Sequence, residues 1–140
     1  MSDTIFSKII AGKVPCAKVY EDEWVFAFMD AGQVNPGHVL VATKKQAETI
    51  LDLDEDTAAA LFRAVHRIAR AIEKAYRPDG LTILQANRPA GFQTVPHVHL
   101  HILPRRKDDG VALTWPRKNP AIEELHRLAE PILKALGLGE

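Results

Sequence analysis

Three histidines at alternating positions constrain this chain more than any other feature. His97, His99 and His101 stand in the segment HVHLHIL, where aliphatic residues occupy the positions between them. Successive side chains of a β-strand point to opposite faces, so a strand would place the three imidazoles on one face and the aliphatic residues in a core. A helix would scatter the same histidines around its axis. Pro104 fits the end of such a strand, because it donates no ladder hydrogen bond.

Three imidazoles in register need an explanation beyond packing, since each buried ring would require a hydrogen-bond partner. At a spacing of about 6.6–6.8 Å along a strand, the rings could line one small anionic group and its two ends. Two histidines in the pattern H-x-H are also common metal ligands. Metal binding therefore stays open beside nucleophilic or acid–base chemistry on an anion.

The segment HVHLHIL resembles the histidine triad (HIT) motif, His-Φ-His-Φ-His-Φ-Φ with Φ apolar. The similarity runs from Thr4 to about Trp115, and it is closest to the Hint branch of nucleotide hydrolases. Three further blocks carry it, in the right order: IFSKIIAGKVP, FAFMDAGQVNPGHVLV and NRPAGFQTVPH. The resemblance implies an α+β, HIT-like fold with an antiparallel sheet of about five strands and packed helices. It also implies a homodimer.

Length and charge agree with a small enzyme. The chain has 140 residues, with 18 basic and 18 acidic side chains that leave no net charge. We expect one domain, with a HIT domain over residues 1–115 and a C-terminal helical extension over 116–140. This balance of charge gives no excess of basic residues of the kind that binds a nucleic-acid polymer. With no apolar run of transmembrane length, no signal peptide and only Cys16, we expect a cytoplasmic protein without membrane contact.

The surrounding pattern predicts further elements. Strands are expected at residues 17–21, 24–30, 38–43 and 81–86. The main helix is expected from a cap at Asp52 or Asp54 to about Tyr76, and a short helix from Asp3 or Thr4 to Gly12. Asn119-Pro120 should start a C-terminal helix that Pro131 kinks or splits and Gly137 ends.

The resemblance also assigns the chemistry. His99 would attack the α-phosphorus of a purine nucleotide or nucleotidyl conjugate, and water would then hydrolyse the nucleotidyl-histidine. His97 would orient His99, while His101 would contact the phosphate and assist the leaving group. A neutral imidazole is a good nucleophile near pH 7, because its pKa lies near 6.5.

Polar positions outside the triad match the family's contacts to ribose and phosphate. Asp30 stands where a carboxylate accepts from the two ribose hydroxyls. Asn87 and Thr94 stand at positions that hold the α-phosphate, and Gln93 adds hydrogen-bonding groups to the same loop. His38 is a fourth histidine near the triad. Each has an ordinary alternative, which is a strand-end cap for Asp30, an exposed loop edge for His38 and general loop polarity for the others.

Apolar positions match the nucleobase pocket and the partner subunit. Ile5, Phe6 and Ile9 would wall the base, although the same stripe could simply pack a core. Trp115 matches a C-terminal tryptophan that lies near the partner subunit's pocket in the Hint branch. Its alternative is a hydrophobic anchor, since tryptophan is often buried without a catalytic role.

The chain also departs from its family. Many bacterial relatives hold a structural zinc through Cys-x-x-Cys and a later histidine, but this chain has Thr4, Ser7 and Gln46 there. Hydroxyls and amides are poor zinc ligands, so we expect no metal and no cofactor. Arg88 and Phe92 stand where the family usually has glycine, which puts the backbone contacts of the phosphate loop in doubt.

We therefore predict a purine nucleoside phosphoramidase-like nucleotide hydrolase. A Fhit-like dinucleoside polyphosphate hydrolase is the alternative within enzymes, because LPRRK after the triad also suits that branch. A non-catalytic nucleotide-binding scaffold is the alternative outside them.

Overall fold

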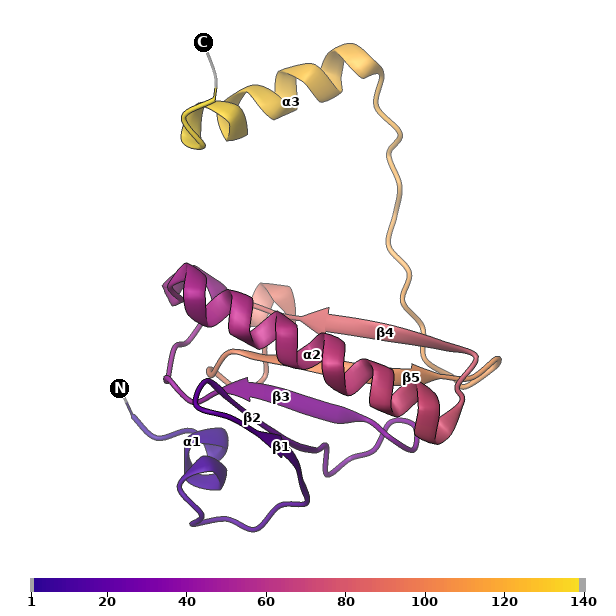
Figure 1. The fold of residues 1–140 in the computed structure, drawn as a ribbon. Helices are drawn as coiled ribbons and strands as arrows, with labels where there is room; N and C mark the ends of the chain where they lie inside the picture. Colours follow the sequence, from indigo (N-terminus) through magenta and orange to yellow (C-terminus); the bar gives the residue numbers. More distant parts are fainter. Residues whose placement is uncertain (1, 139–140) are drawn as a thin grey trace. The chain divides into compact units, whose positions relative to one another are not determined.

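The computed structural model describes residues 2–138, which fall into two units with the division between Asp109 and Gly110. The first unit contains an antiparallel sheet of five strands in the order β1-β2-β3-β5-β4, with helices packed on it (Figure 1). The strands are β1 (Lys18–Glu21), β2 (Val25–Met29), β3 (Val39–Thr43), β4 (Gly80–Gln85) and β5 (His99–Arg105). The predicted α+β fold, with an antiparallel sheet of five strands, is confirmed.

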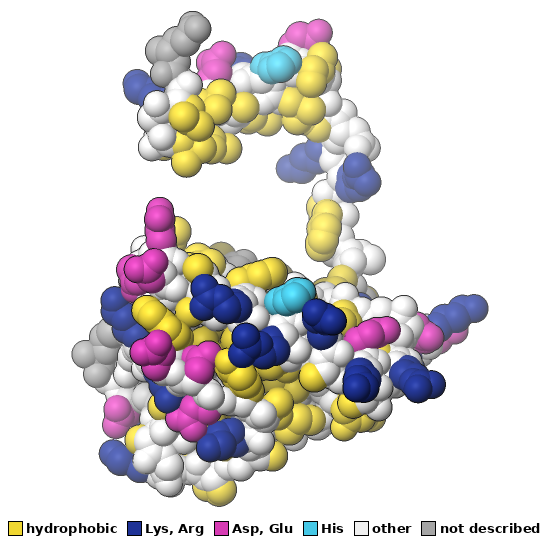
Figure 2. Space-filling model, in the orientation of Figure 1, with side chains coloured by type: hydrophobic (Ala, Val, Ile, Leu, Met, Phe, Trp, Pro, Cys, Tyr) yellow, Lys and Arg dark blue, Asp and Glu magenta, His cyan; other side chains and the backbone are white. Residues whose placement is uncertain are grey.

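Helix α2 (Glu55–Tyr76) covers one face of the sheet (Figure 1). Asp54 caps it as one of the two predicted caps, since its side chain accepts from the backbone N–H of Thr57. Apolar residues of α2 pack against alternate residues of the central strands, namely Val25, Ala27, Val39, Val41, Leu100 and Ile102. The polar side of α2 is solvated, and Figure 2 shows basic and acidic side chains interspersed over this part of the molecule.

Helix α1 (Ile5–Ile10) contributes to the core on the opposite face. Its Phe6 and Ile9 are buried in one cluster with Phe26, Phe28, Leu40 and Ala42 of β2 and β3. In the β3–β5 register, Leu40 lies opposite His101 and Ala42 opposite His99. The α1 side of the sheet is therefore the side of these two histidines, while Val98, Leu100 and Ile102 belong to the α2 core as predicted.

Strand β5 differs from the prediction at both ends. It begins at His99, so His97 precedes the strand and only His99 and His101 share a strand face. Pro104 lies inside the strand and not at its end. This is possible because β3 pairs with β5 only as far as Ile102. Beyond Ile102, no residue of β3 bonds to β5. The side chain of Asn35 instead donates to the Pro104 carbonyl over 2.8 Å.

The second unit contains helix α3 (Ile122–Ala135). It starts after Ala121 and not at Asn119-Pro120, because the backbone of Ala121 is extended, with a φ of −66° and a ψ of 159°. Pro131 does not split the helix, which runs through it. Gly137 ends it as predicted, with a φ of 76° and a backbone bond to Lys134. Among residues 2–138, no helix is long and apolar enough to cross a membrane.

Candidate active site

A cavity of about 410 Å³ opens in the first unit between α1, the end of β2 and the histidines of β5. Its apolar wall includes Ile5, Phe6 and Ile9, the residues predicted to hold the base. Asp30, Thr94, His99 and His101 supply its polar side. The structure thus brings seven of the predicted site residues to one place. Pro15, Cys16 and Ala17 also line it, and none of the three was predicted as a site residue.

His99 is held in one tautomer by the main chain. Its Nδ1 lies 2.6 Å from the backbone oxygen of His97. A carbonyl oxygen can only accept, so Nδ1 carries the proton and Nε2 carries the lone pair. Burial lowers the pKa of His99, and the charge of a protonated His97 would lower it further. The ring is therefore neutral at pH 7, in the form that can act as a nucleophile.

His97 is fully buried and is not part of the cavity wall. Its Nε2 lies 2.7 Å from the backbone oxygen of Thr43, and its Nδ1 lies 3.1 Å from the hydroxyl of Thr4. Burial lowers the pKa of His97 as well, so this ring is also neutral near pH 7. The first histidine therefore acts on His99 through its carbonyl group, while its own ring is anchored on both sides.

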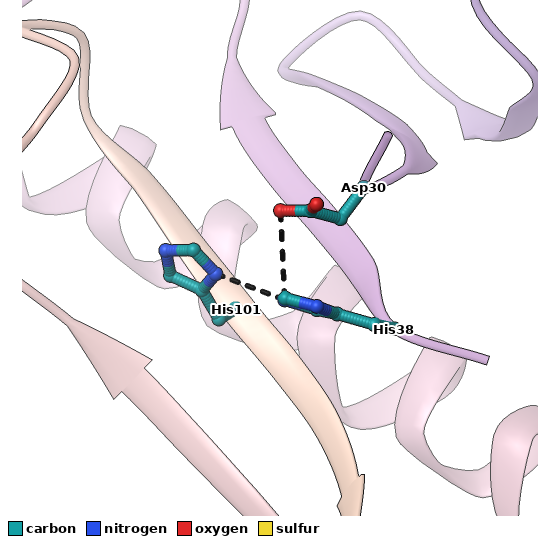
Figure 3. A group of neighbouring side chains, drawn as sticks. All are labelled: Asp30, His38 and His101. Carbon is teal, nitrogen blue, oxygen red and sulfur yellow. Dashed lines mark hydrogen bonds and ion pairs between the residues drawn. The ribbon is translucent and has the colours of Figure 1, made fainter. Parts of the chain in front are cut away.

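His38 and His101 form a second pair (Figure 3). The Nε2 of His38 lies 3.0 Å from Nδ1 of His101, and the backbone N–H of Val34 faces Nδ1 of His38 at 3.4 Å. Because Nδ1 of His38 accepts, its Nε2 carries the proton and donates to His101. The remaining proton of His101 then sits on its Nε2. His38 itself is not among the residues of the cavity wall.

The charge state of this pair follows from burial. Burial lowers the pKa of His38, and the carboxylate of Asp30 opposes that effect. Burial also lowers the pKa of His101 to about 4, and repulsion from charge on His99 and on His38 adds to the shift. At neutral pH both rings are uncharged, so His101 offers an N–H donor and no positive charge.

Asp30 follows directly after β2 and is joined to His38 across the sheet, since its backbone N–H donates to the His38 carbonyl. Its Oδ1 accepts from the backbone N–H of Gly32 over 2.6 Å. Its Oδ2 points toward His38 at 3.7 Å, beyond hydrogen-bond range (Figure 3). A carboxylate in this position can accept from hydroxyl groups in the cavity.

Asp30, His38 and His101 are also a group that could hold a metal ion, since one donor atom of each lies within 4.8 Å of the others. A metal would need lone pairs on both His38 Nε2 and His101 Nδ1. Those two atoms share a proton in the hydrogen bond described above, and the Val34 N–H occupies the other nitrogen of His38. The hydrogen-bond pattern thus favours an imidazole chain over a metal centre.

Two further predicted residues, Asn87 and Gln93, bond to neighbouring segments of the first unit. The side chain of Asn87 bonds to Gln85 and to the backbone N–H of Ile50, and that of Gln93 bonds to the backbone of Arg88 and Glu48. Neither is among the residues that line the cavity. Trp115 belongs to the second unit, where 75% of its surface is exposed.

The sequence did not predict that Thr4 contacts His97. Thr4 was expected as a possible helix cap and as a replaced zinc ligand, and it does cap α1. Its contact with His97 joins residues 93 positions apart, and nothing in the local sequence indicates such a pairing.

Comparison with known proteins identifies the family. The sequence profile of the HIT domain matches residues 11–108, more than half of the chain and all the histidines around the cavity. The chain belongs to the HIT domain family. This HIT protein is 43% identical over 135 residues to the protein Hit of Bacillus subtilis, an alignment that covers 94% of the chain and 93% of the relative.

Another relative of this HIT protein is the adenosine 5'-monophosphoramidase hnt1 of Schizosaccharomyces pombe. It is 33% identical over 129 residues, which cover 91% of the chain and 94% of the relative. The crystal structure of a HIT family member from Bacillus subtilis superposes with a TM-score of 0.90 at 41% identity, covering 95% and 96% of the two chains. The predicted membership of the HIT superfamily, with Hint-like relatives, is confirmed.

Proposed function

We propose that this HIT protein is a hydrolase of purine nucleoside phosphoramidates or related nucleotidyl conjugates, acting at the α-phosphorus through a nucleotidyl-histidine. The proposal depends mainly on the tautomers of two histidines in the cavity wall, His99 and His101. His99 presents the lone pair of Nε2, and its neighbour His101 presents an N–H. A nucleophile beside a hydrogen-bond donor is what attack on a phosphate requires.

In the first step, Nε2 of His99 forms a bond to the α-phosphorus while the bond from phosphorus to the leaving amine breaks. The amine departs with that electron pair and takes a proton from water. His99 keeps its Nδ1 proton, and the His97 carbonyl, 2.6 Å away, stabilises the positive charge that develops on the ring.

In the second step, water attacks phosphorus and the bond to Nε2 breaks. The electron pair returns to His99, and the water releases a proton that balances the one taken by the amine. In both steps Nε2–H of His101 would donate to a nonbridging phosphate oxygen. Because His101 is neutral, its contribution is a hydrogen bond and not proton transfer to the leaving group.

The rest of the cavity suits a nucleoside. Ile5, Phe6 and Ile9 offer an apolar wall for a base, and Asp30 offers acceptors for ribose hydroxyls. HIT family members are generally nucleotide hydrolases, and the relative from Schizosaccharomyces pombe bears the name of a phosphoramidase. Both support the proposed substrate class.

Turnover measurements on matched substrates test the proposal. An adenosine phosphoramidate should be hydrolysed to AMP and amine, and faster than a diadenosine polyphosphate. Faster turnover of the diadenosine polyphosphate would assign the protein to that second class of hydrolase. Binding of AMP with turnover of neither substrate would contradict the proposal and leave a binding scaffold.

We also propose that the protein acts as a homodimer in which Trp115 influences the leaving group at the partner's site. The support is the family resemblance together with the exposure of this large side chain. Trp115→Ala should change the ratio of rates across a series of amine leaving groups while the fold stays intact. An unchanged ratio, or a monomer by light scattering, would contradict this part of the proposal.

A further inference from the structure

Thr4 links the start of α1 to the histidine that precedes β5. Only 8% of its surface is exposed, and its hydroxyl has two partners. It accepts from the backbone N–H of Ser7 over 3.0 Å, as a helix cap does, and it lies 3.1 Å from Nδ1 of His97. The second contact is not needed for capping, so it requires its own explanation.

The direction of this contact follows from the other side of the ring. Nε2 of His97 lies 2.7 Å from the Thr43 carbonyl, which can only accept, so Nε2 carries the proton of the neutral ring. Nδ1 then has only a lone pair to offer. The hydroxyl of Thr4 must therefore donate its one proton to His97 while its oxygen accepts from Ser7.

We propose that Thr4 is a positioning residue for the reaction, because its hydroxyl holds the orientation of the His97 ring and thereby the peptide group that holds His99. This inference rests on the proposed function. His97 is held by α1 at one nitrogen and by the end of β3 at the other. The same residue supplies the carbonyl that accepts from His99.

Helix α1 contacts the two histidines a second time through Phe6. The Phe6 ring meets His99 edge-on with centroids 4.7 Å apart, and it meets His97 at 6.0 Å. Phe6 also belongs to the wall of the cavity. Helix α1 thus contributes both an apolar wall, through Phe6, and the hydrogen bond from Thr4 to His97. Loss of that hydrogen bond should therefore change the position of Nε2 of His99.

The alternative is that Thr4 only caps α1, and four variants separate the two roles. Thr4→Val keeps a similar volume but loses the hydroxyl, whereas Thr4→Ser keeps the hydroxyl. Thr4→Asp keeps an acceptor for the Ser7 N–H but cannot donate to His97. Ser7→Ala removes the reciprocal half of the capping box, in which Ser7 accepts from the Thr4 N–H, without touching His97.

The first readout is the protonation of each imidazole nitrogen, measured by 15N NMR. In the wild type, His97 should carry its proton on Nε2 and His99 on Nδ1. Thr4→Ser and Ser7→Ala should keep that pair of tautomers. Thr4→Asp should place a second proton on Nδ1 of His97. Thr4→Val should keep the proton on Nε2, because the Thr43 carbonyl still accepts it, but should shift the Nδ1 signal because that nitrogen loses its hydrogen-bond donor.

The second readout is the rate at which the nucleotidyl-histidine forms in a single turnover. Thr4→Val should slow this step by about tenfold to a hundredfold, the range seen when an orienting partner of a functional imidazole is removed. Nucleotide affinity should not change, and Thr4→Ser should restore the rate.

A Thr4→Val protein that forms the nucleotidyl-histidine at the wild-type rate would overturn the inference and leave Thr4 as a cap. If that variant does not fold, the wild type still decides, because a proton on Nδ1 of His97 contradicts the assigned direction. If the wild type forms no adduct with any substrate, the proposed function fails, while the NMR comparison still tests Thr4.

Discussion

The Nδ1 atom of His99 lies 2.6 Å from the backbone oxygen of His97. The contact joins the ring of His99 to the main chain of His97, and the two rings are not bonded to each other. Because it fixes the proton on Nδ1, it leaves Nε2 of His99 as the nucleophilic atom at neutral pH. The sequence placed the three imidazoles in a row on one strand face, whereas the structure gives each ring different hydrogen-bond partners.

Stability should fall as the pH falls below neutrality. Burial lowers the pKa values of His38, His97, His99 and His101 in the folded protein. Between those values and the unfolded value near 6.5, the unfolded chain binds more protons, so the free energy of unfolding decreases with pH. The contribution is complete above about pH 6.5 and is lost below it, down to about pH 4 for His101.

Urea unfolding at several pH values measures this effect. We expect His101 alone to lower the free energy of unfolding by about 2 kcal/mol from about pH 7 to about pH 5, and the other three rings to add to that decrease. His101→Asn removes one of the titrating rings, so its stability should depend less steeply on pH. An equal dependence in both proteins would contradict the low pKa assigned to His101.

The loop before the triad stores backbone strain. Phe92 adopts a φ of 72°, in the left-handed region that favours glycine, and 89% of its surface is exposed. Phe92→Gly should therefore be more stable than Phe92→Ala by about 1 kcal/mol, because both lose the ring but only glycine relieves the strain. Thermal unfolding of the two variants measures the difference. An alanine variant at least as stable as the glycine variant would contradict the claim that the backbone at Phe92 is strained.

This loop shows where prediction from sequence succeeds and where it stops. The resemblance to the family implies glycine at the positions of Arg88 and Phe92. Both residues have positive φ here, so the backbone follows a path that favours glycine while carrying other side chains. The departure was visible in the sequence, but its outcome was not. Whether the loop would change its path or accept the strain depends on contacts such as the Gln93 side chain with the Arg88 N–H.

The sheet was easier to predict than its ends. Alternation of histidines with aliphatic residues correctly separated the two faces of β5. The start of that strand depends on its partner, since β3 pairs only as far as Ala42 opposite His99. The role of Thr4 depends on a contact across the fold, which no local spacing indicates.

Activity should not require a divalent metal. The side chains of Thr4, Ser7 and Gln46, at the positions of the family's zinc ligands, make hydrogen bonds to His97 and to nearby backbone. Of the three residues that could hold a metal, His38 and His101 are joined by the imidazole hydrogen bond described above, and Asp30 lies beside them. Exhaustive chelation should therefore leave both turnover and stability unchanged. If chelation removes activity and zinc restores it, a metal-dependent reaction must replace the covalent scheme.

The covalent intermediate gives the most direct test of the account. Wild-type protein mixed with a labelled adenosine phosphoramidate and quenched rapidly should carry the nucleotide on Nε2 of His99, as an acid-labile and base-stable phosphoramidate. His99→Ala removes the nucleophile but retains Asp30 and the apolar wall. It should lose turnover by several orders of magnitude and still bind AMP within about tenfold, or about 1.4 kcal/mol.

Peptide mapping of the quenched protein therefore decides the central claim. The account predicts label on His99 in the wild type and no label in His99→Ala. Label on His97 or His101, or appreciable hydrolysis by His99→Ala, would contradict it.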